Sequence, residues 1–318
     1  MTATVYSELS DRMEASTVQG RHVSISGVLK YLGVSRSGYT SFLHRQPSHT
    51  EKRRNRVKEE IQTIYEHSFR NYGAPKIAYE LRKGGEIISQ RTVGKYMSQM
   101  GIHAQWVKHW TRPKQGSDFT GSLTNILNQN FNPCQPNTFW CTDITYIWTY
   151  EDGFVYLTTI MDLFSRKIIA WTLSRTMETP SCVTNTVKKA MNCRNTINPL
   201  VIHSDRGPQY KSKDYCDITK KMNMKRSYSK KGYPYDNACI ESFHALIKRE
   251  WLKRFRIADY DEAYYLVWEY IETYYNTVRI HSHCDYMSPN QYEKLYDVNS
   301  KKLIKENGKC LTLNCTKT

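Results

Sequence analysis

The sequence of 318 residues lacks several features that define common classes of protein. No apolar run approaches the ~20 residues that a membrane-spanning helix needs, which argues against an integral membrane protein. The polar N-terminus carries no signal-peptide pattern, so we expect a cytoplasmic protein. The nine cysteines include no Cys-x-x-Cys pair and no zinc-type Cys/His pairing. Nothing in the chain suggests a phosphate-binding Walker loop or a Ser-His-Asp catalytic set.

Acidic residues are few relative to basic ones. The chain has 46 Lys and Arg against 30 Asp and Glu, a formal net charge of +16. The excess is spread through the chain: residues 1–131 carry 19 basic residues against 10 acidic ones, and residues 206–256 carry 14 against five. A basic globular protein without a spanning helix usually binds nucleic acid. We therefore expect a nucleic-acid partner and no membrane.

The N-terminal part of the chain shows helical periodicity after a polar start. Residues 1–20 are unpatterned and are expected to be flexible. In the segment 21–48, a short apolar helix, a Gly-Val turn and a second helix capped by Ser35 have helix-turn-helix spacing. This spacing places Arg36 at the start of a DNA-recognition helix. An ordinary helical hairpin is the alternative.

A second basic helical unit is expected in residues 51–104. Its helices are expected at 51–69, 75–82 and 89–100, with a tight turn before the last one. Arg91 and Lys95 on the third helix are candidates for phosphate contacts, with an ordinary solvated face as the alternative. Residues 105–136, which mix basic and aromatic residues with Gly, Ser and Asn, are expected to form a linker that tracks DNA.

From residue 137 the pattern changes from helices to strands. Three closely joined β-prone segments predict an antiparallel meander, and helices then alternate with strands. The expected strands are 138–149, 154–161, 167–173, 200–203 and 224–228. This order predicts an α/β core over residues 137–298, a mixed five-stranded sheet with helices on both faces. The polar tail 299–318 is assigned no structure.

Three carboxylates occupy distinct places in this core. Asp143 interrupts a strand, Asp205 follows a strand, and Glu241 lies in the first turns of a helix. Each residue also has an ordinary structural interpretation. Asp143 would be a charge at a strand edge, Asp205 a turn former, and Glu241 an acid favoured by the dipole in the first turn of a helix. One sheet edge and an adjoining helix would nevertheless bring all three together. Hard cations prefer carboxylate oxygens, so the set predicts a site for two Mg²⁺ or Mn²⁺ ions that cleaves or transfers phosphodiesters.

Several basic residues accompany these carboxylates. Lys248 lies two turns after Glu241 on nearly the same helix face. Lys230 and Lys231 form a basic loop just before that helix, suited to phosphate contacts or simply solvated. Two roles stay open for Arg279, which either binds DNA or locks the last helix onto the core.

Three further polar residues near the carboxylates have structural interpretations. His203 is either a core histidine or a side chain that supports the Asp205 site. Asp236 or Asn237 is expected to cap the helix that carries Glu241.

The resemblance to a known family rests on four stretches: WCTDITYI, HSDRG, GYPYDNACIESFHALIKRE and YYNTVRIHSHCDYMSPNQY. They resemble the transposases of bacterial insertion-sequence family three over about residues 138–293, and the N-terminal helical units resemble that family's too. The resemblance implies a ribonuclease H-like core, similar to retroviral integrases. It also implies that Asp143, Asp205 and Glu241 are the metal-binding catalytic triad. Lys248 would then hold the transposon-end DNA.

The same resemblance implies an activity and its partners. The activity is cleavage that exposes a 3′-OH, followed by strand transfer through a circular intermediate. The partner is double-stranded DNA, both the terminal inverted repeats and the target, bound by a homodimer or larger assembly at the bacterial nucleoid. A DNA-binding regulator with an inert nuclease-like domain and a metal-dependent nuclease without strand transfer are the alternatives.

Two departures from the family pattern remain. Cys284 and Asp285 stand where members commonly have a Leu-Gly pair, which leaves the local turn open. The family's full transposase often includes an upstream reading frame with another helix-turn-helix and a leucine zipper. No heptad run appears in this chain. Either the chain works with such an upstream-frame protein, or it acts without it.

Overall fold

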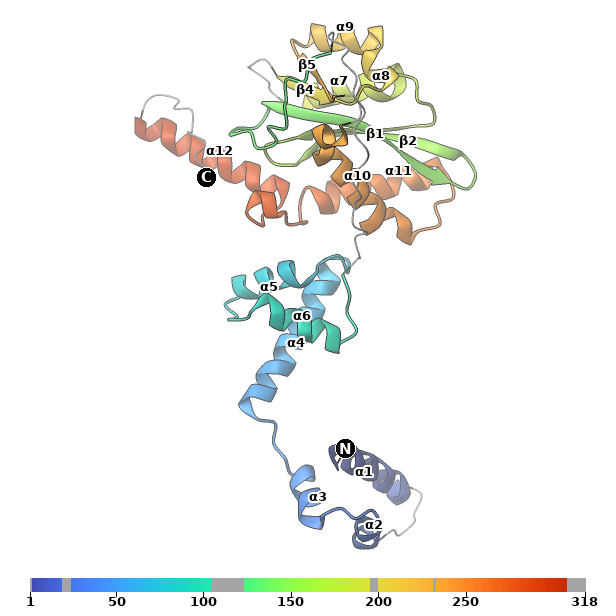
Figure 1. The fold of residues 1–318 in the computed structure, drawn as a ribbon, viewed down its shortest axis with the longest axis vertical. Helices are drawn as coiled ribbons and strands as arrows, with labels where there is room; N and C mark the ends of the chain where they lie inside the picture. Colours follow the sequence, from blue (N-terminus) through green and yellow to red (C-terminus); the bar gives the residue numbers. More distant parts are fainter. Residues whose placement is uncertain (1, 19–23, 105–122, 195–199, 231–232, 308–318) are drawn as a thin grey trace. The chain divides into compact units, whose positions relative to one another are not determined.

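The computed structural model describes residues 2–18, 24–104, 123–194, 200–230 and 233–307 (Figure 1). The chain forms two compact units, Met1–Gln62 and Thr63–Thr318. The division falls within one helix, α4 (His49–His67). Within the described ranges, no helix has the length and apolar character needed to cross a bilayer.

The first unit contains three helices before α4: α1 (Thr2–Val18), α2 (Ile25–Tyr31) and α3 (Arg36–Leu43). The side chains of Ser24 and Ser35 cap α2 and α3, and Gly33 takes the left-handed conformation that the turn between them requires. The expected helix-turn-helix pair of helices is therefore present.

The expectation of a flexible segment at residues 1–20 was wrong, because most of it forms α1. Tyr6 and Leu9, three residues apart, lie on one face of this helix and pack with Leu29 and Tyr39. Two apolar positions in a polar segment give too weak a pattern to be recognised before their packing partners are known.

The second unit begins with the helices α5 (Ala74–Lys83) and α6 (Gln90–Gln99), as expected. Ser89 caps α6 through a hydrogen bond from the backbone nitrogen of Thr92. The two helices pack on each other through buried apolar side chains, Ile77, Leu81, Val93 and Met97. Part of the expected linker, residues 105–122, lies outside the described residues, as does Lys231.

The rest of the second unit is built on the mixed five-stranded sheet that the sequence predicts. Its strands are β1 (Phe139–Thr149), β2 (Gly153–Asp162), β3 (Ile168–Ser174), β4 (Val201–Ser204) and β5 (Lys225–Tyr228). They lie in the order β3-β2-β1-β4-β5. The pairs β1–β2 and β2–β3 are antiparallel, and the pairs β1–β4 and β4–β5 are parallel.

Helices cover both faces of the sheet (Figure 1). One face carries α7 (Asn185–Cys193), which continues a π-helical turn at Pro180–Thr184, with α8 (Pro208–Lys211) and α9 (Lys213–Lys221). The other carries α10 (Ala238–Glu250) and α11 (Tyr260–Trp268), which continues as a π-helical segment, Glu269–Tyr275. Short 3-10 turns occur at Pro234–Asn237, Leu252–Arg254 and Ser282–Cys284. Successive side chains of a strand point to opposite faces, so Trp140 joins one core and Cys141 the other.

The last helix extends further than the sequence suggested. Residues from 299 onward were assigned no structure, but α12 (Pro289–Asn307) continues through the first part of that tail. Lys, Leu and Glu residues there have high helix propensity, which sustains a helix already begun at Pro289. Residues 308–318 lie outside the described ranges.

Candidate active site

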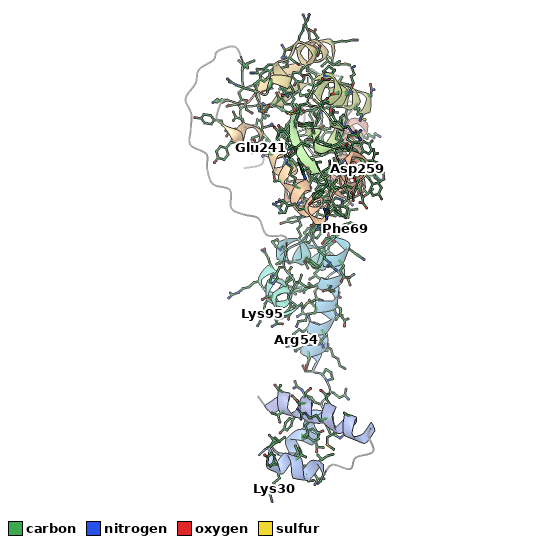
Figure 2. All side chains as sticks on the ribbon, turned by 90° about the vertical axis from the view of Figure 1, so that its right-hand side faces the viewer. Lys30, Arg54, Phe69, Lys95, Glu241 and Asp259 are labelled. Atoms are coloured by element: carbon green, nitrogen blue, oxygen red, sulfur yellow. The ribbon has the colours of Figure 1, made fainter. Side chains whose placement is uncertain are left out.

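The three carboxylates come from β1, the end of β4 and the first turn of α10. In the parallel pair β1–β4, Cys141 is level with His203, so two residues further on Asp143 is level with Asp205. Asp143 lies on the same face of β1 as Cys141, which packs in the core beneath α10. Glu241 begins α10 over this face (Figure 2). Sheet register and helix position together bring the three residues to one region.

The charges of these carboxylates act on one another. Partial burial raises the pKa of Glu241 to about 7, and the negative charges of Asp143 and Asp205 add to this rise. Burial also raises the pKa of Asp205, and Asp143 raises it further. Like charges change each other's pKa in this way only at short range. The three carboxylates therefore act on one another electrostatically, and their role as a metal-binding set stays a prediction.

The carboxylates are accessible and are held in place by their neighbours. Asp205 and Glu241 are exposed, and the Asp143 side chain is 20% exposed. The backbone nitrogen of Gly207 donates to Oδ1 of Asp205 at 2.9 Å. A Cβ at position 207 would lie 3.0 Å from the same oxygen, so glycine is needed for this close approach.

The donor set suits a hard divalent cation. Asp205 and Glu241 form no ion pair with a described residue, so their charges remain for an external cation. Within the described ranges, no three His, Cys, Asp or Glu side chains close around a single position. Mg²⁺ keeps several of its waters when it binds protein, so a pair of carboxylates is enough to hold one ion.

His244 is a site residue that sequence reasoning missed. Its Nδ1 lies 3.2 Å from Oδ2 of Asp143, and its Nε2 lies 2.8 Å from Oγ1 of Thr159. Thr159 is the residue of β2 that pairs with Asp143. The buried imidazole therefore connects the catalytic carboxylate to the neighbouring strand. A histidine one helical turn after Glu241 was the signal available in the sequence.

The candidate DNA-binding residues have different surroundings. Lys248 on α10 is half-buried, which lowers its pKa, and the Asp143 carboxylate opposes that change. Lys248 is thus within electrostatic range of the triad. Arg36 at the start of α3 is exposed, and so are Arg91 and Lys95 on α6, the latter labelled in Figure 2. Lys230 is also exposed.

Arg279 does not fit a DNA-binding role, and this expectation was wrong. Its guanidinium is buried and forms a bidentate ion pair with Glu250, with Nη2 to Oε1 at 2.7 Å and Nε to Oε2 at 2.8 Å. The Tyr270 hydroxyl donates to the same carboxylate. Of the two roles left open, Arg279 has the structural one: it joins the end of α10 to the C-terminal part of the core.

Two other polar residues are now explained. His203 is a core histidine, with its ring nitrogens 2.8 Å from the hydroxyl of Ser227 and 3.0 Å from that of Ser229. Asn237 occupies the N-cap position of α10 but makes no capping hydrogen bond with its side chain, and the side chain of Asp236 does not cap this helix either. It is buried and accepts hydrogen bonds from the Asn125 side chain and from the backbone nitrogen of Lys230, which ties two loops together.

Comparison with protein families agrees with this fold and site. Two models described as integrase core domain match residues 133–234 and 222–289, and a model described as HTH-like domain matches residues 52–110. A mixed five-stranded sheet with its acidic site, preceded by helix-turn-helix units, defines a protein of the integrase-core class.

Curated relatives narrow this class to one family. The transposase for insertion sequence element IS904 of Lactococcus lactis is 36% identical over 252 residues, 79% of this chain and 99% of the relative. Transposase InsF for insertion sequence IS3A of Escherichia coli K12 is 32% identical over 272 residues, 85% of this chain and 94% of the relative. The chain belongs to the IS3 family of insertion-sequence transposases.

Solved structures with a similar fold are more distant. The simian T-cell lymphotropic virus intasome in complex with the PP2A regulatory subunit B56 gamma matches with a TM-score of 0.43 at 14% identity, covering 73% of this chain and 74% of that chain. The HTLV-2 integrase catalytic core domain in complex with magnesium matches with a TM-score of 0.38 at 17% identity, covering 50% of this chain and 97% of that chain.

Proposed function

We propose that this protein is a Mg²⁺-dependent DNA transposase that cuts at the ends of an insertion sequence and joins the exposed ends to another phosphodiester. Burial and, after it, the charges of Asp143 and Asp205 raise the pKa of Glu241 to about 7, and this effect of two carboxylates on the third is the observation that carries the proposal. Uncompensated acidic charge next to an open face is what a cation-assisted phosphoryl-transfer site requires. The transposase names of the curated relatives support the choice of DNA as the substrate.

Asp143, Asp205 and Glu241 would hold two divalent ions, Mg²⁺ or Mn²⁺. Such ions, when bound, activate the attacking oxygen and stabilise the leaving oxygen. Glu241 must be ionised to bind a cation, so the Mg²⁺ concentration needed for activity should fall as pH increases through about 7. His244 holds Asp143 in place, and Lys248 contacts a phosphate of the transposon end.

The proposed reaction has two steps that balance without an external energy source. Water attacks the phosphodiester at the element's end, and the bond to the 3′ oxygen breaks, which leaves a 3′-OH. This hydroxyl then attacks a second phosphodiester in line, one new ester bond forms, and one old ester bond breaks. Joining one end to the other by this step would give a circular intermediate before integration into target DNA.

The N-terminal helical units supply recognition in this proposal. Arg36 on α3, and Arg91 and Lys95 on α6, are exposed at or near the starts of helices with helix-turn-helix spacing. The match of residues 52–110 to an HTH-like domain supports DNA contact by α6. Two transposon ends must be held together for joining, so we propose a homodimer or larger assembly on DNA, with or without an upstream-frame partner.

The test is incubation of the full chain with labelled end DNA and Mg²⁺. Cut and joined products are expected. Products that are cut but never joined would indicate a nuclease instead, and binding with neither product would indicate a regulator with an inert catalytic domain.

The Asp205→Asn variant tests the triad itself. Loss of this carboxylate should lower cutting and joining by roughly 10³-fold or more, because several kcal/mol of transition-state stabilisation depend on the bound cations. Affinity for end DNA should change little, since recognition is assigned to the helical units. Asp261→Asn, an exposed position on α11, is the matched control. Full activity in Asp205→Asn would show that the triad is misassigned.

A further inference from the structure

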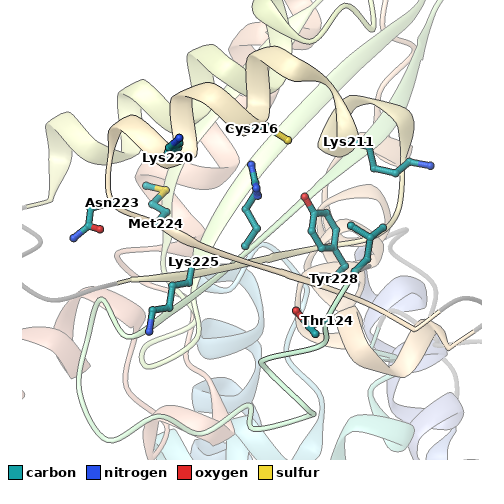
Figure 3. Close-up of a pocket in the computed structure, with 10 residues that line it drawn as sticks. Thr124, Lys211, Cys216, Lys220, Asn223, Met224, Lys225 and Tyr228 are labelled. Carbon is teal, nitrogen blue, oxygen red and sulfur yellow. The ribbon is translucent and has the colours of Figure 1, made fainter. Parts of the chain in front are cut away.

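A basic pocket lies beside the edge strand β5, on the face of the sheet that carries α8 and α9 (Figure 3). Its volume is about 650 Å³. We call it the α9–β5 pocket and define it by the side chains that matter below: Lys211, Cys216, Lys220, Lys225, Arg226 and Tyr228. None of these residues belongs to the carboxylate triad or to its neighbours on α10.

The pocket is positively charged without compensation. Four of its lining side chains are cations, Lys211, Lys220, Lys225 and Arg226, and none is a carboxylate. No ion pair joins any of the four to an acidic side chain in the described part of the chain. Four cations around one hollow create a positive potential there, which favours the binding of an anion.

The walls of the pocket are fixed by hydrogen bonds. The backbone nitrogen of Tyr228 donates to the carbonyl oxygen of Thr124 at 3.0 Å, which holds the segment before β1 against the edge of the sheet. The Tyr228 hydroxyl donates to the carbonyl oxygen of Tyr210 at 3.0 Å, which joins β5 to α8. A preformed pocket of this kind loses little conformational entropy when a ligand binds.

One end of the pocket reaches the active site. Lys211 ends α8, the short helix that starts at Pro208, three residues after Asp205. The hydroxyl of Tyr210, the residue before Lys211, lies 3.2 Å from Oγ1 of Thr142, the residue before Asp143, so the end of α8 stands beside the strand that carries this carboxylate. Lys248 approaches the triad from α10, which covers the opposite face of the sheet. The carboxylates thus have a separate basic element on each side.

We propose that the α9–β5 pocket binds the phosphodiester backbone of a DNA strand that continues from the active site past Lys211. This inference rests on the proposed function, because it takes DNA to be the substrate. The shared chemistry is a row of phosphates, and the strand comes either from the transposon end or from the target. Each lysine that neutralises a phosphate releases a counterion, so binding here must depend on salt.

The test compares two double variants of the full chain with equal loss of charge. Lys220→Gln/Lys225→Gln removes two pocket cations, and Lys213→Gln/Lys221→Gln removes two exposed lysines of α9 that do not line the pocket. Affinity is measured without metal, over a series of salt concentrations, for a duplex that carries the element's end and for an unrelated target duplex.

The pocket variant should bind at least one of these duplexes about tenfold more weakly or worse near 0.1 M salt. The logarithm of the binding constant decreases linearly with the logarithm of the salt concentration. For that duplex the magnitude of this slope should be smaller by about two units, one for each lost phosphate contact. The duplex that is affected identifies the source of the strand. Unchanged affinity for both duplexes, or an equal loss in the control variant, would overturn the proposal.

Cys216 gives a second readout that needs no variant. It is a free, half-buried thiol in the pocket, while Cys193 is a free, exposed thiol outside it. Saturating DNA should slow alkylation of Cys216 about fivefold or more, as measured by peptide mass mapping, and leave Cys193 unchanged. Equal alkylation of Cys216 with and without bound DNA would contradict the proposal.

Both measurements are independent of catalysis. A chain that neither cuts nor joins DNA can still show or fail to show occupation of the pocket. Conversely, an active transposase with an unaffected pocket variant would leave the proposed function in place and remove only this inference.

Discussion

Asp143 is surrounded by residues that control its position and its charge. It is level with Asp205 across the β1–β4 pair, its negative charge acts on Glu241, and the ring of His244 contacts its carboxylate. A side chain that binds a metal must be oriented before the ion arrives, and partners behind the ligand supply that orientation. His244 and Thr159 have this place behind Asp143.

We expect His244→Ala to raise the Mg²⁺ concentration needed for half-maximal end cleavage by roughly 10- to 100-fold. The physical reason is that Asp143 loses the contact that fixes its carboxylate. Thr159→Val should have a smaller effect in the same direction, because it frees the ring of His244.

The matched control for this prediction is Thr159→Ser, which keeps the hydroxyl and should behave as the wild type. Direct calorimetric measurement of Mg²⁺ affinity should show the same order of variants as the cleavage assay. Unchanged Mg²⁺ affinity in His244→Ala would exclude a positioning role.

Arg279 shows that a basic residue of the core can be purely structural. Replacing it by Met should lower the free energy of unfolding by about 3–5 kcal/mol, because Glu250 would be left buried and unpaired. Urea denaturation would measure this loss.

The companion variant Arg279→Met/Glu250→Leu removes both charges and should recover much of the stability. The fraction of Arg279→Met that remains folded should bind end DNA within about twofold of wild type, since this guanidinium is paired inside the core. A large loss of DNA affinity in the stable double variant would restore a DNA-binding role for Arg279.

At the scale of elements, the turn from β2 to β3 depends on a buried acid. The Asp162 carboxylate accepts hydrogen bonds from the backbone nitrogens of Asn137 and Phe164, at 2.8 and 3.0 Å. Burial raises its pKa to about 6 from the ordinary 3.8, despite these two donors. The side chain thus connects the residue before β1 to the end of β2 by hydrogen bonds, while burial disfavours its ionised form.

This position predicts a pH dependence of stability. The folded chain holds the Asp162 proton more tightly than the unfolded chain does, so the stability linked to that proton is complete below about pH 4 and is lost as pH rises through 6. Asp162→Asn cannot titrate. Its stability relative to wild type should therefore improve by roughly 3 kcal/mol between pH 4 and 7. Urea denaturation at several pH values measures this difference, and a constant difference would contradict the assignment.

At the scale of the whole molecule, excess positive charge occurs both in the helical units and in the catalytic core. In the proposed function, the exposed side chains of Arg91 and Lys95 on α6 recognise the transposon end, and the three carboxylates perform the chemistry. Recognition and catalysis should then be separable by substitution, because they use different elements.

The double variant Arg91→Gln/Lys95→Gln should bind end DNA about tenfold more weakly or worse. The magnitude of the slope of log binding constant against log salt concentration should be smaller by up to about two units. The rate of cutting at saturating DNA should stay near wild type, because the carboxylates are untouched. Filter binding and a single-turnover cleavage assay measure the two quantities. Glu86→Gln/Gln99→Glu, which leaves the net charge of this unit unchanged, is the control. A loss of cutting rate with no loss of affinity would contradict the division of labour.

Much of the fold was predictable from local sequence. Closely joined β-prone segments marked β1, β2 and β3. Caps and turn residues such as Ser35 and Ser89 marked where helices begin. These signals are local because secondary structure depends on hydrogen bonds and side-chain faces within a few residues.

The sequence by itself determined the order of the strands and most of the helices, and with the family resemblance it predicted a role for Asp143, Asp205 and Glu241. Only the tertiary structure decided which strand lies beside β1, that His244 contacts Asp143, that Arg279 pairs with Glu250, and that four cations surround the α9–β5 pocket. Each of these facts joins segments that are distant in the chain, and whether a charge is solvated, paired or buried depends on partners that no local pattern specifies.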